Sequence, residues 1–463
     1  MASPRGFAKK PTLPARALLS GLPPNRSMLT DILRALLGLT VLIGFCVLFS
    51  ENRRAIDWRL VGGGLLLQLV LALLFLVVPG GNWIFDQLAT FFVWVTDFST
   101  QGAKFVFGEL ADGRTMDRVI GKDLGFIFAF QVLPTIIFFS ALCSLLYYIG
   151  LLQKVVWAFA WVSKKFMKLS GAESLAAAAE IFLGQTESPL MIKPYIDRMN
   201  RSEIFALMTG GMATIAGGVL LAYITFLGGN DDAQKIIFAK FLLCASFMGA
   251  PASLVVAKLL IPQTEPIDDS LHVPKDKLGA NMLDALANGT SEGLKLAANV
   301  GAMLIAFVAF AALVNGCLKW VGGLCHHPEL SLDLLLGYLF MPVAWIIGVD
   351  APDASKVGAL LGTKLVLTEF IAYKNLGDLK MPPGGGVSLL SAKSIFIATF
   401  ALCGFANFAS IGIQLGGTGS IAPGQRPTIA ALGFKAVLAG TIATLMTATL
   451  AGALFQFAHI ARP

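Results

Sequence analysis

Long apolar runs recur along the whole chain, separated by short polar or glycine-rich segments. A transmembrane helix needs about 20 consecutive apolar residues. The runs that approach or exceed this length lie at residues 29–50, 61–78, 124–152, 203–227, 236–261, 293–321, 391–415 and 428–459. Several of them are rich in glycine, alanine, serine and threonine, as close packing between membrane helices requires. The pattern therefore predicts an all-α polytopic membrane protein.

Other segments do not have the pattern of a plain span. Residues 83–97 and 155–169 mix aromatic residues with acids or lysines, which is typical of helices that lie in the membrane interface. Residues 1–28 are basic and rich in proline, and the apolar run after them is too long for the core of a signal peptide. We therefore predict a disordered N-terminal tail, followed by spanning and interfacial helices over 29–170. Residues 263–292 are hydrophilic and predict a solvent-exposed connector before a scaffold helix at 293–321.

Composition supports the membrane prediction and excludes other classes. Hydrophobic residues make up 56% of the chain and charged residues 14%, against roughly 25% charged residues in soluble domains. The net charge of +7 fits basic loops near anionic lipid and does not indicate nucleic-acid binding. The six cysteines are scattered, and the consecutive residues Cys325, His326 and His327 cannot all face one ion without a sharp turn, so we expect no disulfide framework and no metal site other than a possible sodium site.

Two apolar segments are interrupted near their middle. Residues 171–197 contain Gly-Gln-Thr-Glu-Ser-Pro, which leaves apolar arms of about 10 residues, or about 15 Å of helix each. Residues 331–373 again place glycine, lysine and glutamate among aliphatic residues, and each segment is followed by a small-residue helix, at 203–227 and 391–415. We predict two repeats, 171–262 and 330–463, each with a re-entrant hairpin and an unwound helix, the second ending in the last helix. Interrupted segments in corresponding halves indicate a transport site near the membrane midplane.

Acidic residues within these segments support this interpretation. Glu180, Glu187 and Glu369 lie in apolar surroundings, where an acid costs about 2.5 to 3.5 kcal/mol on insertion scales. One alternative is that they lie near an interface, or form structural ion pairs with Lys193 or Lys364. Three such acids beside interrupted helices favour a functional site, because ionisable groups inside the membrane are usually functional.

Five motifs, in this order, resemble those of the concentrative nucleoside transporter family: GQTESPLMIKPYI, TIAGGVL, EGLKLAANVGAMLIAFVA, GTKLVLTEFIAY and ALCGFANFASIGI. The resemblance covers residues 29–459. It implies about eight transmembrane helices plus two re-entrant hairpins in an inverted-repeat, elevator-type fold. It also implies a homotrimer in the bacterial inner membrane that imports nucleosides of the uridine, cytidine and adenosine class, driven by sodium or protons, with no other cofactor.

The resemblance also assigns site residues. The positions that contact the base correspond to three polar residues and one apolar residue, Gln185, Thr186, Glu187 and Val219. An amide, a hydroxyl and a carboxylate together can match the donors and acceptors of a nucleobase edge. The positions near the ribose and the nucleoside ring correspond to Glu369, Asn407, Ser410 and Phe405. Taken singly, Ser410 or Asn407 could be a polar group of helix packing, Phe405 would more often belong to the core, and Val219 would indicate nothing.

The coupling-cation positions correspond to Glu180, Leu183, Thr214 and Ile215, the second and fourth through their backbone carbonyls. The chain departs from the family here, because Glu180 replaces an asparagine. A carboxylate can bind sodium as a hard oxygen ligand, or it can carry a proton. We hypothesise altered coupling, with protons at least as well supported as sodium; the alternative is that Glu180 faces elsewhere and the sodium site survives. In a second departure, Thr368 stands where relatives often have asparagine, which affects only the detail of ribose recognition.

Three classes of function compete on these grounds. A secondary transporter explains the hairpins, the repeat and the acids together. A passive nucleoside channel or a receptor could use the same pocket but would not need a cation site beside it. An enzyme would need a nucleophile and base, or a carboxylate cluster, within the bilayer, and the only histidine of a predicted span is His459 at its end. We therefore expect no enzymatic activity.

Overall fold

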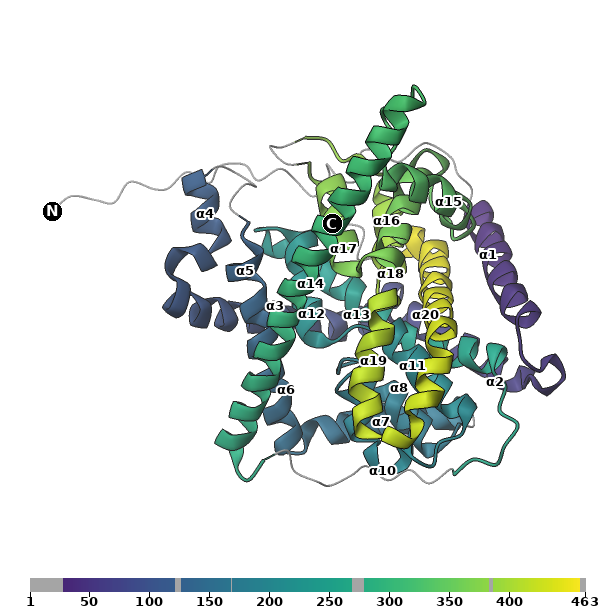
Figure 1. Ribbon diagram of the computed structural model, residues 1–463. Helices are drawn as coiled ribbons and strands as arrows, with labels where there is room; N and C mark the ends of the chain where they lie inside the picture. Colours follow the sequence, from purple (N-terminus) through teal and green to yellow (C-terminus); the bar gives the residue numbers. More distant parts are fainter. Residues whose placement is uncertain (1–27, 121–125, 168, 269–278, 383–385, 459–463) are drawn as a thin grey trace.

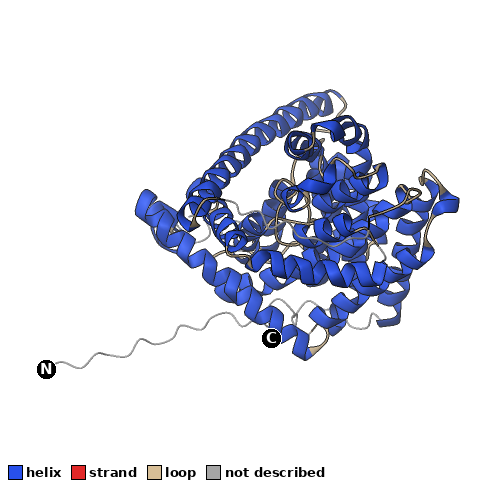
Figure 2. Cartoon of the chain, turned by 90° about the horizontal axis from the view of Figure 1, so that it is seen from below, coloured by secondary structure: helices blue, strands red, loops and turns tan. Residues whose placement is uncertain are grey.

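The computed structural model describes residues 28–458 except 121–125, 168, 269–278 and 383–385. The described residues form helices and connecting loops without any β-strand (Figure 2). Seven helical segments among them are long and apolar enough to cross a membrane. The disordered tail predicted for 1–28 lies outside the described residues except for Met28, where the first helix begins, and so does His459.

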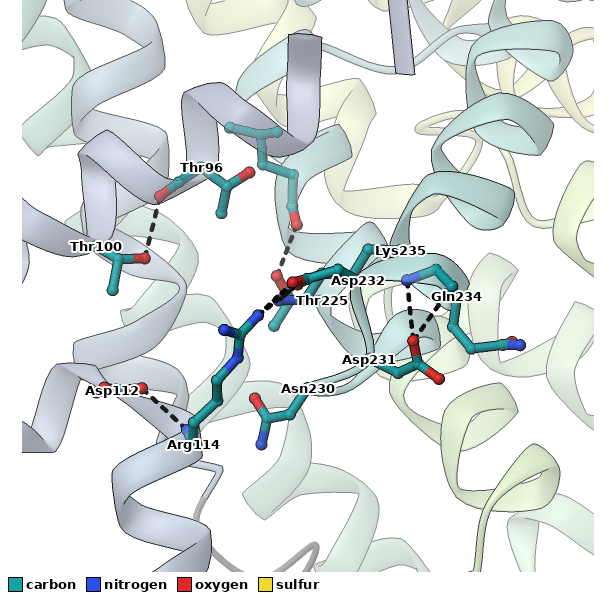
Figure 3. Close-up of polar contacts among 12 residues, drawn as sticks. Thr96, Thr100, Asp112, Arg114, Thr225, Asn230, Asp231, Asp232, Gln234 and Lys235 are labelled. Atoms are coloured by element: carbon teal, nitrogen blue, oxygen red, sulfur yellow. Dashed lines mark hydrogen bonds and ion pairs between the residues drawn. The ribbon is translucent and has the colours of Figure 1, made fainter. Parts of the chain in front are cut away.

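The N-terminal region begins with α1 (Met28–Leu48) and α2 (Trp58–Leu76), followed by α3 (Pro79–Phe107), α4 (Gly113–Ile120), α5 (Phe128–Gln131), α6 (Leu133–Tyr148) and α7 (Leu151–Met167). Helix α3 has 29 residues and extends well beyond the segment predicted as interfacial. Neither α3 nor α7 is among the seven candidate spans. The short helix α4 contacts the first repeat through Arg114, which pairs with Asp232 at 2.6 Å (Figure 3).

Three further ionic and polar contacts stabilise this corner of the molecule, which is formed by α3, α4 and residues 230–232. Lys104 of α3 pairs with Asp112 at 2.5 Å, and Thr115 donates to the same carboxylate. Partial burial raises the pKa of Asp112, but the hydrogen bonds from Lys104 and Thr115 outweigh this effect and hold the pKa below its ordinary value. Asn230, in the turn before α13 (Asp232–Leu260), donates to Asp117 of α4 at 2.5 Å. The corner therefore joins α3 and α4 to the first repeat.

The first repeat supplies a large part of the core. It consists of α8 (Gly171–Glu180), the irregular segment 181–187, the short helices α9 (Ser188–Met191) and α10 (Lys193–Ile196), and the pair α11 (Arg201–Ala213) and α12 (Gly217–Gly228). Ser170 and Glu173 form a capping box that fixes the start of α8. Prolines at the first turns of α9 and α10 divide the returning arm into two short helices. The most apolar stretches of α11–α12 and of α13 are completely buried.

Helix α14 (Met282–Leu324) differs from the prediction. It has 43 residues, or about 64 Å of helix, and begins inside the segment expected to be a connector. The Asn281 side chain accepts from the backbone N–H of Asp284 and caps the helix, so the polar residues 282–292 continue it. One face packs closely on α6, because a Cβ added to Gly289 would lie 2.5 Å from Ser144 Cβ. The other face is largely exposed, and α14 runs along the outside of the molecule (Figure 1).

The second repeat corrects the predicted hairpin of residues 331–373. Helix α15 (Leu332–Ile346) is a separate element that ends before Gly348, whose φ of +109° favours glycine. The two arms around the polar turn are α16 (Ala354–Val366) and α17 (Glu369–Lys380), followed by α18 (Ala392–Ala401), α19 (Phe408–Ile421) and α20 (Arg426–Leu454). Helices α15 and α16 pack closely, since a Cβ on Gly358 would lie 2.7 Å from the carbonyl oxygen of Gly337.

Each repeat has a helix that is broken in its middle. The two breaks, residues 214–216 between α11 and α12 and residues 402–407 between α18 and α19, lie against each other. Gly404, in the segment between α18 and α19, has a φ of +111°, and an added Cβ would lie 2.7 Å from the carbonyl oxygen of Met212 at the end of α11. Gly440 of α20 packs on both sides, with an added Cβ 2.7 Å from Met212 Cβ and 3.3 Å from Ala406 Cβ. The two breaks therefore meet in the core, next to α20.

Candidate functional site

A chain of hydrogen bonds joins both repeats where the interruptions meet. Gln185 of the first polar turn donates through Nε2 to the Ser410 hydroxyl at 3.1 Å. The Ser410 backbone N–H donates to Oδ1 of Asn407 at 2.9 Å, and Nδ2 of Asn407 donates to Oε2 of Glu369 at 2.6 Å. The Tyr223 hydroxyl donates to the other oxygen of Glu369 at 3.0 Å. One polar network thus connects the first turn, α19, α17 and α12.

Local capping places the polar groups of the second repeat. Asn407 is the N-cap of α19, and its side chain serves the Ser410 N–H and Glu369 together. Thr368 is the N-cap of α17, and its hydroxyl accepts from the Ile371 N–H at 3.5 Å. Threonine and asparagine are both good N-cap residues. Thr368 therefore performs the capping role that an asparagine at this position would also perform.

The buried carboxylate of Glu369 is compensated by dipoles and hydrogen bonds. Its side chain is 2% exposed and accepts from the Tyr223 hydroxyl and the Asn407 amide. Glu369 is also the first residue of α17, where the partial positive charge of a helix N-terminus favours an anion. Lys364 is one of the two lysines that could form a structural ion pair with these acids. Its ammonium group instead donates to the carbonyl oxygens of Ala401 and Cys403 and to Thr444 Oγ1.

The other predicted substrate residues lie on the elements that carry this network. Val219 is buried on α12, one turn before Tyr223. Thr186 and Glu187 are partly exposed at the first turn, and Thr186 lies against α19, where a Cβ on Gly417 would be 3.2 Å from Thr186 Cγ2. Phe405 is partly buried in the segment between α18 and α19 and packs against the core.

Sequence reasoning missed two members of the site, Tyr223 and Gln414. Each lies four residues after a predicted site residue on the same helix, Val219 and Ser410, so the i, i+4 spacing was an available signal. Gln414 donates to the carbonyl oxygen of Met208 at 3.0 Å. In the part of the chain that the structure describes, the amide oxygens of Gln185 and Gln414 are buried without a hydrogen-bond partner.

These two oxygens can bind a ligand. Leaving a buried acceptor unsatisfied costs about 1–3 kcal/mol. A bound molecule that presents N–H or O–H donors would remove this cost.

The predicted cation residues gather on the first repeat. Glu180 is 1% exposed, accepts from the Ser188 hydroxyl at 3.3 Å, and lies so close to Gly210 that an added Cβ there would be 1.8 Å from Oε2. Thr214, in the break, donates from Oγ1 to the Gly210 carbonyl at 3.0 Å. Leu183 and Ile215 are buried at the turn and the break. Glu180 and Thr214 therefore meet at one residue of α11, and Glu180 faces the interrupted helix.

This donor set has the chemistry of a site for a hard cation. Carboxylate, hydroxyl and carbonyl oxygens are the ligands that hard cations prefer. The Thr214 oxygen keeps lone pairs for a cation while its proton is donated to Gly210. Elsewhere, no group of three or more histidine, cysteine, aspartate or glutamate side chains able to hold a metal is found among the described residues, and the Cys-His-His motif is no exception.

Family models match most of the chain. The N-terminal model described as "Na+ dependent nucleoside transporter N-terminus" matches residues 37–110, and the corresponding C-terminal model matches residues 241–452. Between them, a model described as "Nucleoside recognition" matches residues 129–230. The last range contains the first polar turn and the first interrupted helix.

Individual relatives agree with the family models. A "Nucleoside permease NupC" of Helicobacter pylori is 42% identical over 92% of this chain and 98% of its own length. An "Uncharacterized transporter" of Haemophilus influenzae is 45% identical over 91% of this chain and 97% of its own length.

Solved structures show the same fold. The transporter CNTnw in an inward-facing substrate-bound state matches with a TM-score of 0.85 and 41% identity, over 92% of this chain and 98% of that one. A variant of CNTnw in an outward-facing state matches with a TM-score of 0.84 and 42% identity, over the same shares. The chain belongs to the family of Na+ dependent nucleoside transporters and is an integral membrane transporter rather than an enzyme.

Proposed function

We propose that this protein imports nucleosides of the uridine, cytidine and adenosine class across the bacterial inner membrane. The observation that carries the proposal is the polar network that joins Gln185 to Glu369 across both interruptions. A nucleoside bound there contacts both repeats at once. CNTnw has been solved in outward-facing and inward-facing states, which supports alternating access rather than a passive channel or receptor.

The network divides into a base end and a ribose end. The buried amide oxygen of Gln185 accepts from the base, and the partly exposed Thr186 and Glu187 complete its polar edge. At the other end, Glu369 and Asn407 exchange hydrogen bonds with ribose hydroxyls, because a carboxylate accepts and an amide both donates and accepts.

The flanking residues complete the proposed nucleoside site. Ser410 links the two ends, and Val219 and Phe405 supply apolar contact to the nucleoside. Uptake of labelled uridine in competition with unlabelled uridine, cytidine and adenosine tests the substrate class. Failure of all three unlabelled nucleosides to compete would reject it.

Glu180 is the group through which the cation gradient acts. The family is sodium-dependent by description, and Glu180, Thr214 and the carbonyls of Leu183 and Ile215 offer hard oxygen ligands. The same carboxylate, buried beside Ser188 and Gly210, can instead carry a proton. In both mechanisms the charge of Glu180 is neutralised together with nucleoside binding.

The coupling experiment compares uridine uptake into proteoliposomes under a sodium gradient or a proton gradient, for the native chain and for Glu180→Gln. We expect accumulation in the native chain and its loss in Glu180→Gln under the gradient that drives it. Glu203→Gln is the matched control, because Glu203 is also buried on this repeat and belongs to the capping box of α11, a role that glutamine shares. Accumulation by Glu180→Gln at the native level would reject the role of Glu180.

The protein functions as a homotrimer with elevator-type movement. Helix α14 is longer than a bilayer requires and leaves an apolar face uncovered, including Ile305, Phe310 and Leu313. A second copy of the chain, in addition to lipid, can cover this face. Native mass spectrometry of the detergent-solubilised protein tests the assembly, and a monomer would contradict it.

A further inference from the structure

Lys364 is a fully buried lysine on α16 and has no role in the transport mechanism proposed above. Its side chain is 2% exposed, and it lies two residues before the end of the helix. The ammonium group donates to the carbonyl oxygen of Ala401 at 3.0 Å, to Thr444 Oγ1 at 3.1 Å and to the carbonyl oxygen of Cys403 at 3.4 Å. An ammonium has three donors, and here each has an oxygen acceptor.

Two of these acceptors are carbonyls that are free to accept because α18 ends at Ala401. Ala401 is the last residue of α18, and Cys403 lies in the segment that follows. The last carbonyls of a helix have no partner within it. Thr444 of α20 completes the set from the opposite side and donates its own proton to the Thr441 carbonyl. Lys364 therefore sits in a cage of oxygens formed by the break and α20.

The two repeats place a charged group at corresponding points. In the first, Glu180 ends the arm before the polar turn and faces α11 just before its break. In the second, Lys364 lies near the end of the arm before the turn and faces the end of α18 just before its break. The first repeat thus has an acid that can receive a mobile cation, and the second has a cation attached to the chain.

We infer that Lys364 is a built-in cation that takes, in the second repeat, the place of the coupling cation in the first, and so positions the substrate residues of that repeat. The segment that it holds leads directly to Phe405 and Asn407. Its charge also attracts that of Glu369, five residues further along. This inference deepens the proposed function, on which its consequence for nucleoside binding rests.

The test is chemical rescue of a truncated side chain. Lys364 lines a cavity of about 20 Å³ between α15, α16 and α20, and Lys364→Ala enlarges it enough for methylammonium. We expect Lys364→Ala to bind uridine at least about tenfold more weakly than the native chain, and methylammonium to restore part of the affinity. Native affinity in Lys364→Ala, or lost affinity that methylammonium does not restore, would overturn the inference.

Lys380→Ala is the matched control. Lys380, at the end of α17, is 5% exposed and also donates to a carbonyl at a helix end, that of Leu227 at 2.6 Å. Leu227 lies near the end of α12 that is farther from the break. We expect native uridine affinity in this variant and no response to methylammonium. Equal loss and rescue in Lys380→Ala would show a general effect of buried lysines and would overturn the assignment.

Two further measurements keep the test decisive. If Lys364→Ala does not fold, Lys364→Met keeps the side-chain volume without the charge; reduced uridine affinity supports the inference, and native affinity overturns it. The melting temperature gives a readout that needs no nucleoside, because methylammonium is expected to raise that of Lys364→Ala and not that of Lys380→Ala. If the native chain binds no uridine, the proposed function fails, and the thermal shift still tests the cation cage.

Discussion

Replacing Tyr223 by phenylalanine removes one hydroxyl from the centre of the site. The Tyr223 hydroxyl donates to Glu369 Oε1 at 3.0 Å, while its ring stacks on Tyr373 with centroids 4.3 Å apart. Phenylalanine keeps the ring and its stacking. The change therefore isolates a single hydrogen bond to a charged group, which contributes about 1.5–3 kcal/mol.

The expected loss lies at the lower end of this range. Glu369 keeps its second donor, the Asn407 amide at 2.6 Å, so the carboxylate is only partly released. A loss of about 1.5 kcal/mol corresponds to about a tenfold weaker interaction. We expect Tyr223→Phe to raise the KM for uridine about tenfold, because Glu369 no longer has its fixed orientation.

Tyr373→Phe is the matched control within the same ring stack. The Tyr373 hydroxyl donates at 2.8 Å to the carbonyl oxygen of Thr399, not to Glu369. This variant is expected to lower the melting temperature and to leave the KM for uridine unchanged. The assay is the initial rate of uridine uptake into proteoliposomes, with the melting temperature of each variant. A folded Tyr223→Phe with native KM, or an equal rise of KM in Tyr373→Phe, would refute the reasoning.

Three further changes test other contacts. Gly404→Ala is expected to abolish uptake and to lower the melting temperature, because both the positive φ and the contact with α11 exclude a Cβ. Gly44→Ala is the neutral control, because no atom lies within 4 Å of an added Cβ there. Native uptake in Gly404→Ala would contradict the prediction. Gly210→Ala is expected to displace the Glu180 carboxylate and to uncouple uptake from the cation gradient while leaving uridine binding measurable, and gradient-driven accumulation at the native level would count against the cation site. Arg114→Ala removes an ion pair that is half-exposed (Figure 3), so we expect a change in stability of about 0–1 kcal/mol that disappears at high salt; a larger change in the melting temperature that is insensitive to salt would show that the corner is structurally essential.

Much of this site follows from simple patterns in the sequence. Apolar runs of sufficient length gave the spanning helices, and polar residues beside glycine and proline marked the first turn. Four of the predicted polar residues, Gln185, Ser410, Asn407 and Glu369, lie in one hydrogen-bonded chain. Glu369 and the polar turn that contains Gln185 could be found from the pattern, because polar groups in an apolar segment need compensation whatever the fold. Asn407 and Ser410 were assigned only through the resemblance to the family.

The remainder depends on contacts between distant segments. Tyr223 stands in an apolar helix where an aromatic residue needs no special explanation, and only its distance to Glu369 reveals its role. Lys364 entered the sequence analysis only in the alternative of a structural ion pair. Its hydrogen-bond partners are the Thr444 hydroxyl and two carbonyls that become available only where α18 ends.

Helix bounds show the same limit. The end of the predicted connector, from Met282 on, becomes the start of α14 because Asn281 caps the helix there. The predicted second hairpin is divided because α15 ends before Gly348. The cap or the positive φ of a single residue decides where such a helix begins or ends. The pattern of hydrophobic residues contains no signal for either feature.

The most direct test of the account is whether uridine is accumulated against its own gradient. Purified protein in proteoliposomes is given labelled uridine at equal concentrations on both sides, and a sodium or a proton gradient is then imposed. Cation-coupled transport predicts that internal uridine rises above the external concentration under at least one gradient and returns to it when an ionophore dissipates that gradient. Uridine that stays at the external concentration under both gradients would contradict coupled transport.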